Sequence, residues 1–171
     1  MLEQLWILDE LPAWLPTRNH LSRLASAPRH HLADPALAAR LLGIGADGLI
    51  DNAPTGPEVP RDGTLLGALF ESLAALSLRV YAQGLDAGVA HLRTHSGDRE
   101  VDMIVERGDG RVVAVEVKLS QAVNDRDVRH VRWLAQRIGD DLLDAIILTT
   151  GAEAYRRPDG IGVVPLALLG P

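Results

Sequence analysis

Three polar residues near the middle of the chain could do chemistry together. Asp102 lies in EVDMIVER, and Glu116 and Lys118 lie in VAVEVKLS, the next apolar segment. Carboxylate oxygens bind hard cations such as Mg²⁺ and Mn²⁺, and an adjacent ammonium group can orient a water molecule or stabilise negative charge. Sixteen of the seventeen basic residues are arginine, so the single lysine is either sequence drift or a requirement for an ammonium group. This set of residues suits hydrolysis of a phosphodiester bond.

A hairpin would bring the two carboxylates together. The sequence GDG (108–110) separates two segments that alternate apolar and polar residues, which is typical of antiparallel strands. A three-residue turn with Gly110 in the left-handed conformation places Asp102 opposite Glu116, whereas a two-residue turn pairs Asp102 with Val117. Facing carboxylates repel unless a cation lies between them or one is protonated. The first register therefore predicts a site.

A third carboxylate lies on an apolar helix predicted over residues 64–81. Glu71 is the only charged residue in its first half. The residues that share its helical face are small or apolar: Gly67, Ala68, Ala74, Ala75 and Leu78. A carboxylate in such surroundings needs a partner or a metal, unless Glu71 only tops a partly exposed stripe. In the first case Glu71 would hold a second metal ion or a metal-bound water.

An amphipathic helix is predicted over residues 126–138. One side is apolar, and the opposite stripe carries basic and aromatic side chains, namely Arg126, Arg129, His130, Trp133 and Arg137. Such a stripe could contact phosphates while the indole stacks on a base. It could equally form an interface with a protein partner, since arginine and tryptophan are favoured there. Further strands are expected at 88–95 and 144–150, with a closing strand or helical turn at 162–169.

The chain divides into three parts by composition. Residues 1–50 form an N-terminal appendage, with a helix at 2–8, irregular strands, and a short helix capped by Asp34 and ended by Gly43. Residues 51–63 contain three prolines and two glycines and are expected to form a loop. Residues 64–171 form the core. The adjacent histidines His30 and His31 should point to opposite sides of an extended segment.

Composition excludes several classes of protein. The chain has 171 residues, enough for one domain with a real core, and 47% of them are hydrophobic. The absence of cysteine excludes disulfides, thiolate zinc sites, iron–sulfur clusters and a cysteine nucleophile. A net charge of −6 argues against coating nucleic acid by bulk electrostatics. No apolar run approaches about 20 residues, and the N-terminus is acidic, so we expect a soluble cytoplasmic protein without a membrane segment.

These residues resemble the PD-(D/E)XK superfamily, the restriction-endonuclease-like nucleases. The matching positions are Glu71 on a helix, Asp102 in EVD, and Glu116 and Lys118 in ExK, with Val101 in place of the proline of the name motif. The resemblance implies an α/β fold (an α+β sandwich) with a restriction-endonuclease-like core, in which helices flank a mixed sheet. These four residues would be catalytic. Mg²⁺ or Mn²⁺ would be held by Asp102, Glu116 and the carbonyl of Val117, with Glu71 nearby.

A narrower resemblance is to the C-terminal domain of unknown function found in many prokaryotic AAA-type ATPases. It covers most of residues 29–166, including HHLADPALAARLLGI, GALFESLAALSL and VAVEVKLS, and residues 2–16 look like the tail of the linker to the ATPase. The motif GxxxxGK[ST] is absent, so we expect no nucleotide cofactor and no ATP hydrolysis. The sequence therefore leaves two alternative functions: a metal-dependent nuclease that acts on DNA, and a non-catalytic module. The module would bind DNA or a protein partner, either an ATPase half or a second copy.

Overall fold

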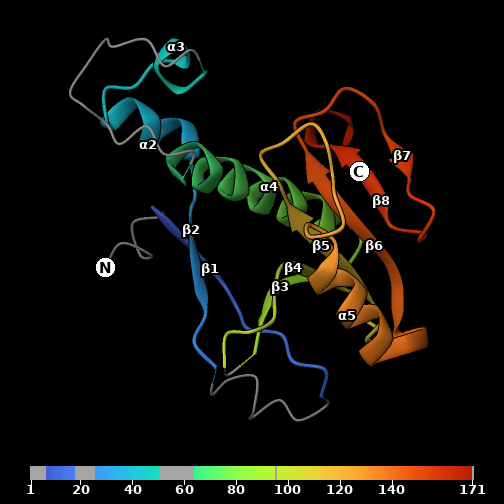
Figure 1. The fold of residues 1–171 in the computed structure, drawn as a ribbon. Coiled ribbons are helices and arrows are strands. Elements are labelled where there is room, and N and C mark those ends of the chain that lie inside the picture. The colour runs from blue at the N-terminus through green and yellow to red at the C-terminus, as the bar shows by residue number, and fades with distance from the viewer. Residues whose placement is uncertain (1–6, 18–25, 51–63, 95, 171) are drawn as a thin grey trace.

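A six-stranded mixed sheet forms the centre of the molecule, in the order β3-β4-β5-β6-β8-β7 (Figure 1). The computed structural model describes residues 7–17, 26–50, 64–94 and 96–170. The strands are β3 (Gly88–Arg93), β4 (Glu100–Glu106), β5 (Val112–Val117), β6 (Leu142–Thr149), β7 (Tyr155–Arg156) and β8 (Gly162–Pro165). The first three are antiparallel neighbours, β6 runs parallel to both β5 and β8, and β7 is antiparallel to β8. This arrangement confirms the predicted mixed sheet.

Two helices cover opposite faces of this sheet and confirm the predicted flanking layers. They are α4 (Thr64–Gly84) and α5 (Arg129–Ile138), the latter followed by a short 3₁₀ turn at Gly139–Asp141. The alternation of β4 and β5 divides the core between them. Met103 and Val115 pack in the cluster under α4, whereas Ile104 and Ala114 pack in the cluster under α5. A second 3₁₀ turn, Leu166–Leu168, follows β8.

Helix α4 corrects the expectation that no apolar segment is long enough to cross a membrane. Leu65–Gly84 passes that test by length and composition, with a hydropathy of 1.4. The sequence alone did not indicate such a segment, because the charged residues Glu71 and Arg79 interrupt its apolar run. In the fold, Ala74, Ala75 and Leu78 are buried in the cluster beneath the helix. Core helices of soluble proteins meet the same criteria.

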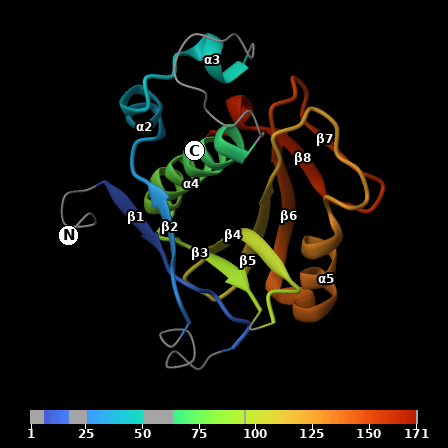
Figure 2. The same cartoon turned by 60° about the vertical axis from the view of Figure 1, so that its left-hand side comes forward.

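The N-terminal part adds a small two-stranded sheet and two short helices (Figure 2). Strand β1 (Leu8–Leu11) pairs antiparallel with β2 (Arg29–Leu32), and the helices are α2 (Pro35–Leu41) and α3 (Ala46–Ile50). As predicted, the Asp34 side chain accepts a hydrogen bond from the backbone N–H of Leu37, 2.9 Å away, and so caps α2. Helix α3 was not predicted.

The helix expected at residues 2–8 lies mostly outside the described residues, and its last residue, Leu8, belongs instead to strand β1. The loop expected at 51–63 also lies outside them. Beyond β1, the backbone joins the large sheet. The N–H of Trp14 donates to the carbonyl of His91 at 2.6 Å, and the N–H of His91 donates to the carbonyl of Pro12 at 2.9 Å. The N-terminal segment is therefore attached to strand β3 by backbone hydrogen bonds.

Candidate functional site

The turn between β4 and β5 determines which residues face each other at the site. Met103 pairs with Val115, and continuing this register by one residue places Asp102 opposite Glu116. Gly110 has a φ of +85°, the left-handed conformation expected for a three-residue turn. The structure thus selects the three-residue turn and excludes the register that would pair Asp102 with Val117.

Substitution of Gly110 tests whether its left-handed conformation stabilises this turn. Gly110→Ala is expected to lower the free energy of unfolding by about 1 kcal/mol, because a side chain disfavours positive φ. Gly108→Ala is the matched control, since this glycine lies in the same turn without a positive φ and a Cβ there would meet nothing within 4 Å. Urea denaturation of both variants measures the difference. Equal losses would show that Gly110 does not hold the turn through its conformation.

Asp102, Glu116 and Lys118 meet where β4 begins and β5 ends. The Glu116 side chain is buried, and its Oε1 accepts a hydrogen bond from Lys118 Nζ at 2.7 Å. Among the described residues, its other oxygen, Oε2, is buried without a hydrogen-bond partner. Asp102 Oδ2 accepts a hydrogen bond from the backbone N–H of Val117 at 2.9 Å. One buried carboxylate oxygen therefore remains unsatisfied beside a second carboxylate, which is costly unless a proton or a cation compensates.

The proton affinities of these groups reflect that arrangement. Burial, and then the negative charge of Asp102, raise the pKa of Glu116 to about 7, although Lys118 acts in the opposite direction. Burial disfavours the charge on Lys118, but the attraction of Glu116 and Asp102 outweighs it and raises the pKa of Lys118. At neutral pH the lysine is charged while Glu116 is close to half-protonated. Glu116 is therefore the carboxylate of this site whose protonation changes near neutral pH.

A guanidinium group fills the space between the remaining carboxylates. Arg29 Nη1 on β2 donates to Glu71 Oε1 at 2.6 Å and lies 3.5 Å from Asp102 Oδ1, while its Nη2 donates to Glu100 Oε1. The side chains of Arg29 and Glu71 are 30% and 25% exposed, so water screens the contact only partly. The sequence had predicted neither Arg29 nor Glu100 at the site.

Glu71 is therefore placed beside Asp102 through a shared arginine. On its helical face Ala74 and Ala75 are buried whereas Ala68 is exposed, so Glu71 lies at the edge of the core. Burial and the charge of Asp102 raise the pKa of Glu71, and Arg29 does not outweigh them. The partner that this carboxylate requires is thus present in the protein itself.

The described residues do not form a ready-made cage for a metal. Within them, no group of three or more His, Asp or Glu side chains is arranged to hold an ion. What they offer is the pair Asp102 and Glu116, with the unsatisfied Oε2 of Glu116. Such a pair suits Mg²⁺ or Mn²⁺, because these ions are commonly bound by one or two carboxylates and complete their shell with water and substrate oxygens.

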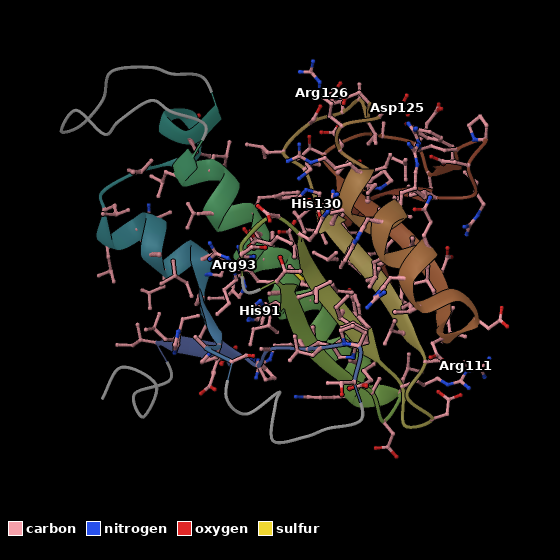
Figure 3. The ribbon with its side chains drawn as sticks, turned by 60° about the horizontal axis from the view of Figure 1, so that its bottom comes forward. His91, Arg93, Arg111, Asp125, Arg126 and His130 are labelled. Atoms are coloured by element: carbon pink, nitrogen blue, oxygen red, sulfur yellow. The ribbon has the colours of Figure 1, made fainter. Side chains whose placement is uncertain are left out.

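Only part of the basic stripe predicted on residues 126–138 lies on the observed helix, where Arg129, Trp133 and Arg137 share one face at four-residue spacing. Arg126 is exposed but precedes α5, and Figure 3 shows it beside Asp125 at one end of the helix, with Arg111 near the other end. Trp133 packs against the core, and the guanidinium of Arg99 lies 5.7 Å from its ring centroid. Part of the indole surface is therefore in contact with the protein itself and not free to stack on a base.

The two remaining arginines of the stripe lie at opposite ends of α5. Arg129 is the first residue of the helix, and its Nε donates to His130 Nε2 at 2.7 Å. Arg137 lines a cavity of about 440 Å³ together with Asp109 and Asp141. This cavity adjoins the hairpin turn, at the end of β4 and β5 away from Asp102.

The fold and the site together define a mixed α/β domain with a carboxylate and lysine cluster at the ends of two central strands. The chain belongs to the family described as Domain of unknown function (DUF4143), whose model matches residues 66–169, more than half of the chain. No curated protein and no solved structure gives a match. The match confirms that residues 66–169 form a domain of unknown function, and it assigns no superfamily. The matched region contains Glu71, Asp102, Glu116 and Lys118 but not Arg29.

Proposed function

We propose that this chain is a metal-dependent nuclease domain of the PD-(D/E)XK type, which hydrolyses phosphodiester bonds of DNA with Mg²⁺ or Mn²⁺. The observation that supports it best is the pair of facing carboxylates, Asp102 and Glu116, beside the only lysine of the chain. The unsatisfied Oε2 of Glu116 is a position where a cation would stabilise the site. The order of helix, hairpin, helix and strand also agrees with that of the superfamily core.

Each residue has a defined role in this proposal. Asp102, Glu116 and the carbonyl of Val117 would hold the ion, which when bound supplies Lewis acidity and neutralises charge on the phosphate. Lys118 Nζ already donates to Glu116 Oε1, and from there it would orient the attacking water and stabilise the developing charge. Glu71 would assist through its second carboxylate oxygen, because its Oε1 accepts a hydrogen bond from Arg29.

Calorimetric titration with Mn²⁺ tests whether the carboxylates form a metal site. We expect wild type to bind and Asp102→Asn/Glu116→Gln not to bind, with or without a short DNA duplex. Asp140→Asn/Asp141→Asn is the matched control, because it removes the same charge from two exposed acids that follow α5. Binding by wild type that is equal in the site variant, or no binding even with DNA present, would contradict the proposal.

Metal binding should depend on pH because Glu116 must lose its proton. With the pKa of Glu116 at about 7, the apparent affinity for Mn²⁺ should fall about tenfold for each pH unit below 7. Above pH 8 the dependence should disappear. Titrations from pH 5.5 to 8.5 measure this, and a constant affinity over that range would exclude Glu116 as a ligand.

A second candidate function is a non-catalytic module of this fold that binds DNA or a protein partner, such as the ATPase of an AAA-type system. The observation that favours it is Arg29, which already pairs with Glu71 and Glu100 and approaches Asp102. The net charge of −6 also favours a protein partner over DNA. Co-purification of an ATPase, combined with no nicking of DNA in Mn²⁺, would support the module. Both candidates imply a protein of the cytoplasm.

A further inference from the structure

Arg29 makes unequal contacts with the three carboxylates around it. Glu71 Oε1 lies 2.6 Å from its Nη1, and Glu100 is bound as closely through Nη2. Asp102 Oδ1 lies 3.5 Å from Nη1, so this contact is the weakest of the three. Two strong contacts therefore fix the guanidinium, and the third can be lost without releasing it.

Asp102 is the carboxylate shared between Arg29 and the proposed metal site. Its Oδ2 is held by the backbone N–H of Val117, which leaves Oδ1, the oxygen that faces Arg29. The Asp102 side chain is only 14% exposed, so charges near it are poorly screened. A divalent cation on Oδ1 would lie close to the guanidinium and be repelled by it.

We propose that Arg29 is an internal counter-ion that competes with divalent cations for Asp102. This inference rests on the proposed metal site and concerns its regulation. Without metal, Arg29 neutralises part of the charge of Glu71, Glu100 and Asp102 and keeps the acidic cluster together. When a cation binds, the guanidinium gives up Asp102 and stays with its two closer partners. Arg29 is thus a positioning residue that lowers the affinity for metal.

Mn²⁺ titration of the whole chain without nucleic acid tests the competition. Arg29→Gln is expected to bind Mn²⁺ about tenfold or more tightly than wild type, because one nearby positive charge is removed. Arg132→Gln is the matched control. It also removes an arginine that pairs with aspartates, but these are Asp125 and Asp159 rather than residues of the acidic cluster, and its affinity should equal that of wild type. Arg29→Gln/Asp102→Asn should lose the gain.

The outcomes separate this inference from the proposed function. Binding by Arg29→Gln alone, or tighter than by wild type, supports the competition. Equal or weaker binding by Arg29→Gln, with loss of binding in Asp102→Asn, overturns the competition but leaves the metal site. No binding by either protein, also with DNA present, overturns both. Thermal unfolding checks that each variant folds. If Arg29→Gln does not fold, Arg29→Lys replaces it and should bind about threefold tighter than wild type, since one ammonium cannot bridge three carboxylates.

Discussion

Lys118→Ala is expected to lower metal-dependent nicking of a DNA duplex by a factor of about 10² to 10³. The ammonium group is in direct contact with Glu116, and its loss would remove both orientation of the water and stabilisation of the transition state. Nicking of supercoiled plasmid in Mn²⁺ measures the rate. The assay belongs at pH 8.5, because Lys118 lowers the pKa of Glu116 and its removal would leave Glu116 more protonated at pH 7.

Two further variants make the Lys118 prediction specific. Lys118→Arg keeps a charged donor and should retain part of the activity, whereas Arg40→Ala removes an exposed basic residue on α2 and should change nothing. Thermal unfolding of Lys118→Ala is needed, because Lys118 is the partner of a buried carboxylate and its loss could also destabilise the fold. A folded Lys118→Ala variant that nicks DNA like wild type would exclude a catalytic role.

His31 is expected to make the protein less stable in acid by about 3 kcal/mol. Burial, and then the positive charge of Arg29, lower the pKa of His31 from 6.5 to about 4. A pKa that is depressed by folding gives stability that is present above pH 6.5 and is lost as the pH falls towards 4. The shift corresponds to about 3 kcal/mol, or more than two orders of magnitude in the folding equilibrium.

Urea denaturation between pH 4 and 7.5 measures this dependence. The informative quantity is the difference between wild type and His31→Asn, because subtraction removes the opposite contribution of Glu116, whose raised pKa makes its share of stability fall as the pH rises. His30→Gln is the control, since this neighbour is exposed while His31 is buried, as the alternation of an extended segment predicted. Parallel curves for wild type and His31→Asn would rule out His31 as the cause.

The elements of the core could be predicted because their signals are local. The alternation of apolar and polar residues around GDG predicted β4 and β5. The left-handed conformation of Gly110 in the structure then decided between the two predicted registers. Asp34 gave the start of α2 in the same way. Strand β7 was missed because it has only two residues, both exposed, so no alternation can show in it. Periodicity predicts elements that bury one face, and it says little about short edge strands.

The candidate site could be predicted only in part. Asp102, Glu116 and Lys118 lie on paired strands, so the register alone brings them together. Arg29 was missed because it comes from another sheet, 42 residues before Glu71, and nothing in the local pattern connects the two. The apolar helical face around Glu71 did indicate that this carboxylate needs a partner, but it gave no means of choosing between a metal ion and one of sixteen arginines.

The N-terminal segment, which is attached to β3 by backbone hydrogen bonds, belongs to the same structural domain as the region matched by the family model. The region that defines the family begins at residue 66, yet the cation that balances its acidic cluster lies at residue 29. A protein cut at the family boundary would retain Glu71, Glu100 and Asp102 without their guanidinium. The smallest form of this domain that keeps the arginine partner of its acidic residues is therefore longer than the segment matched by the family model.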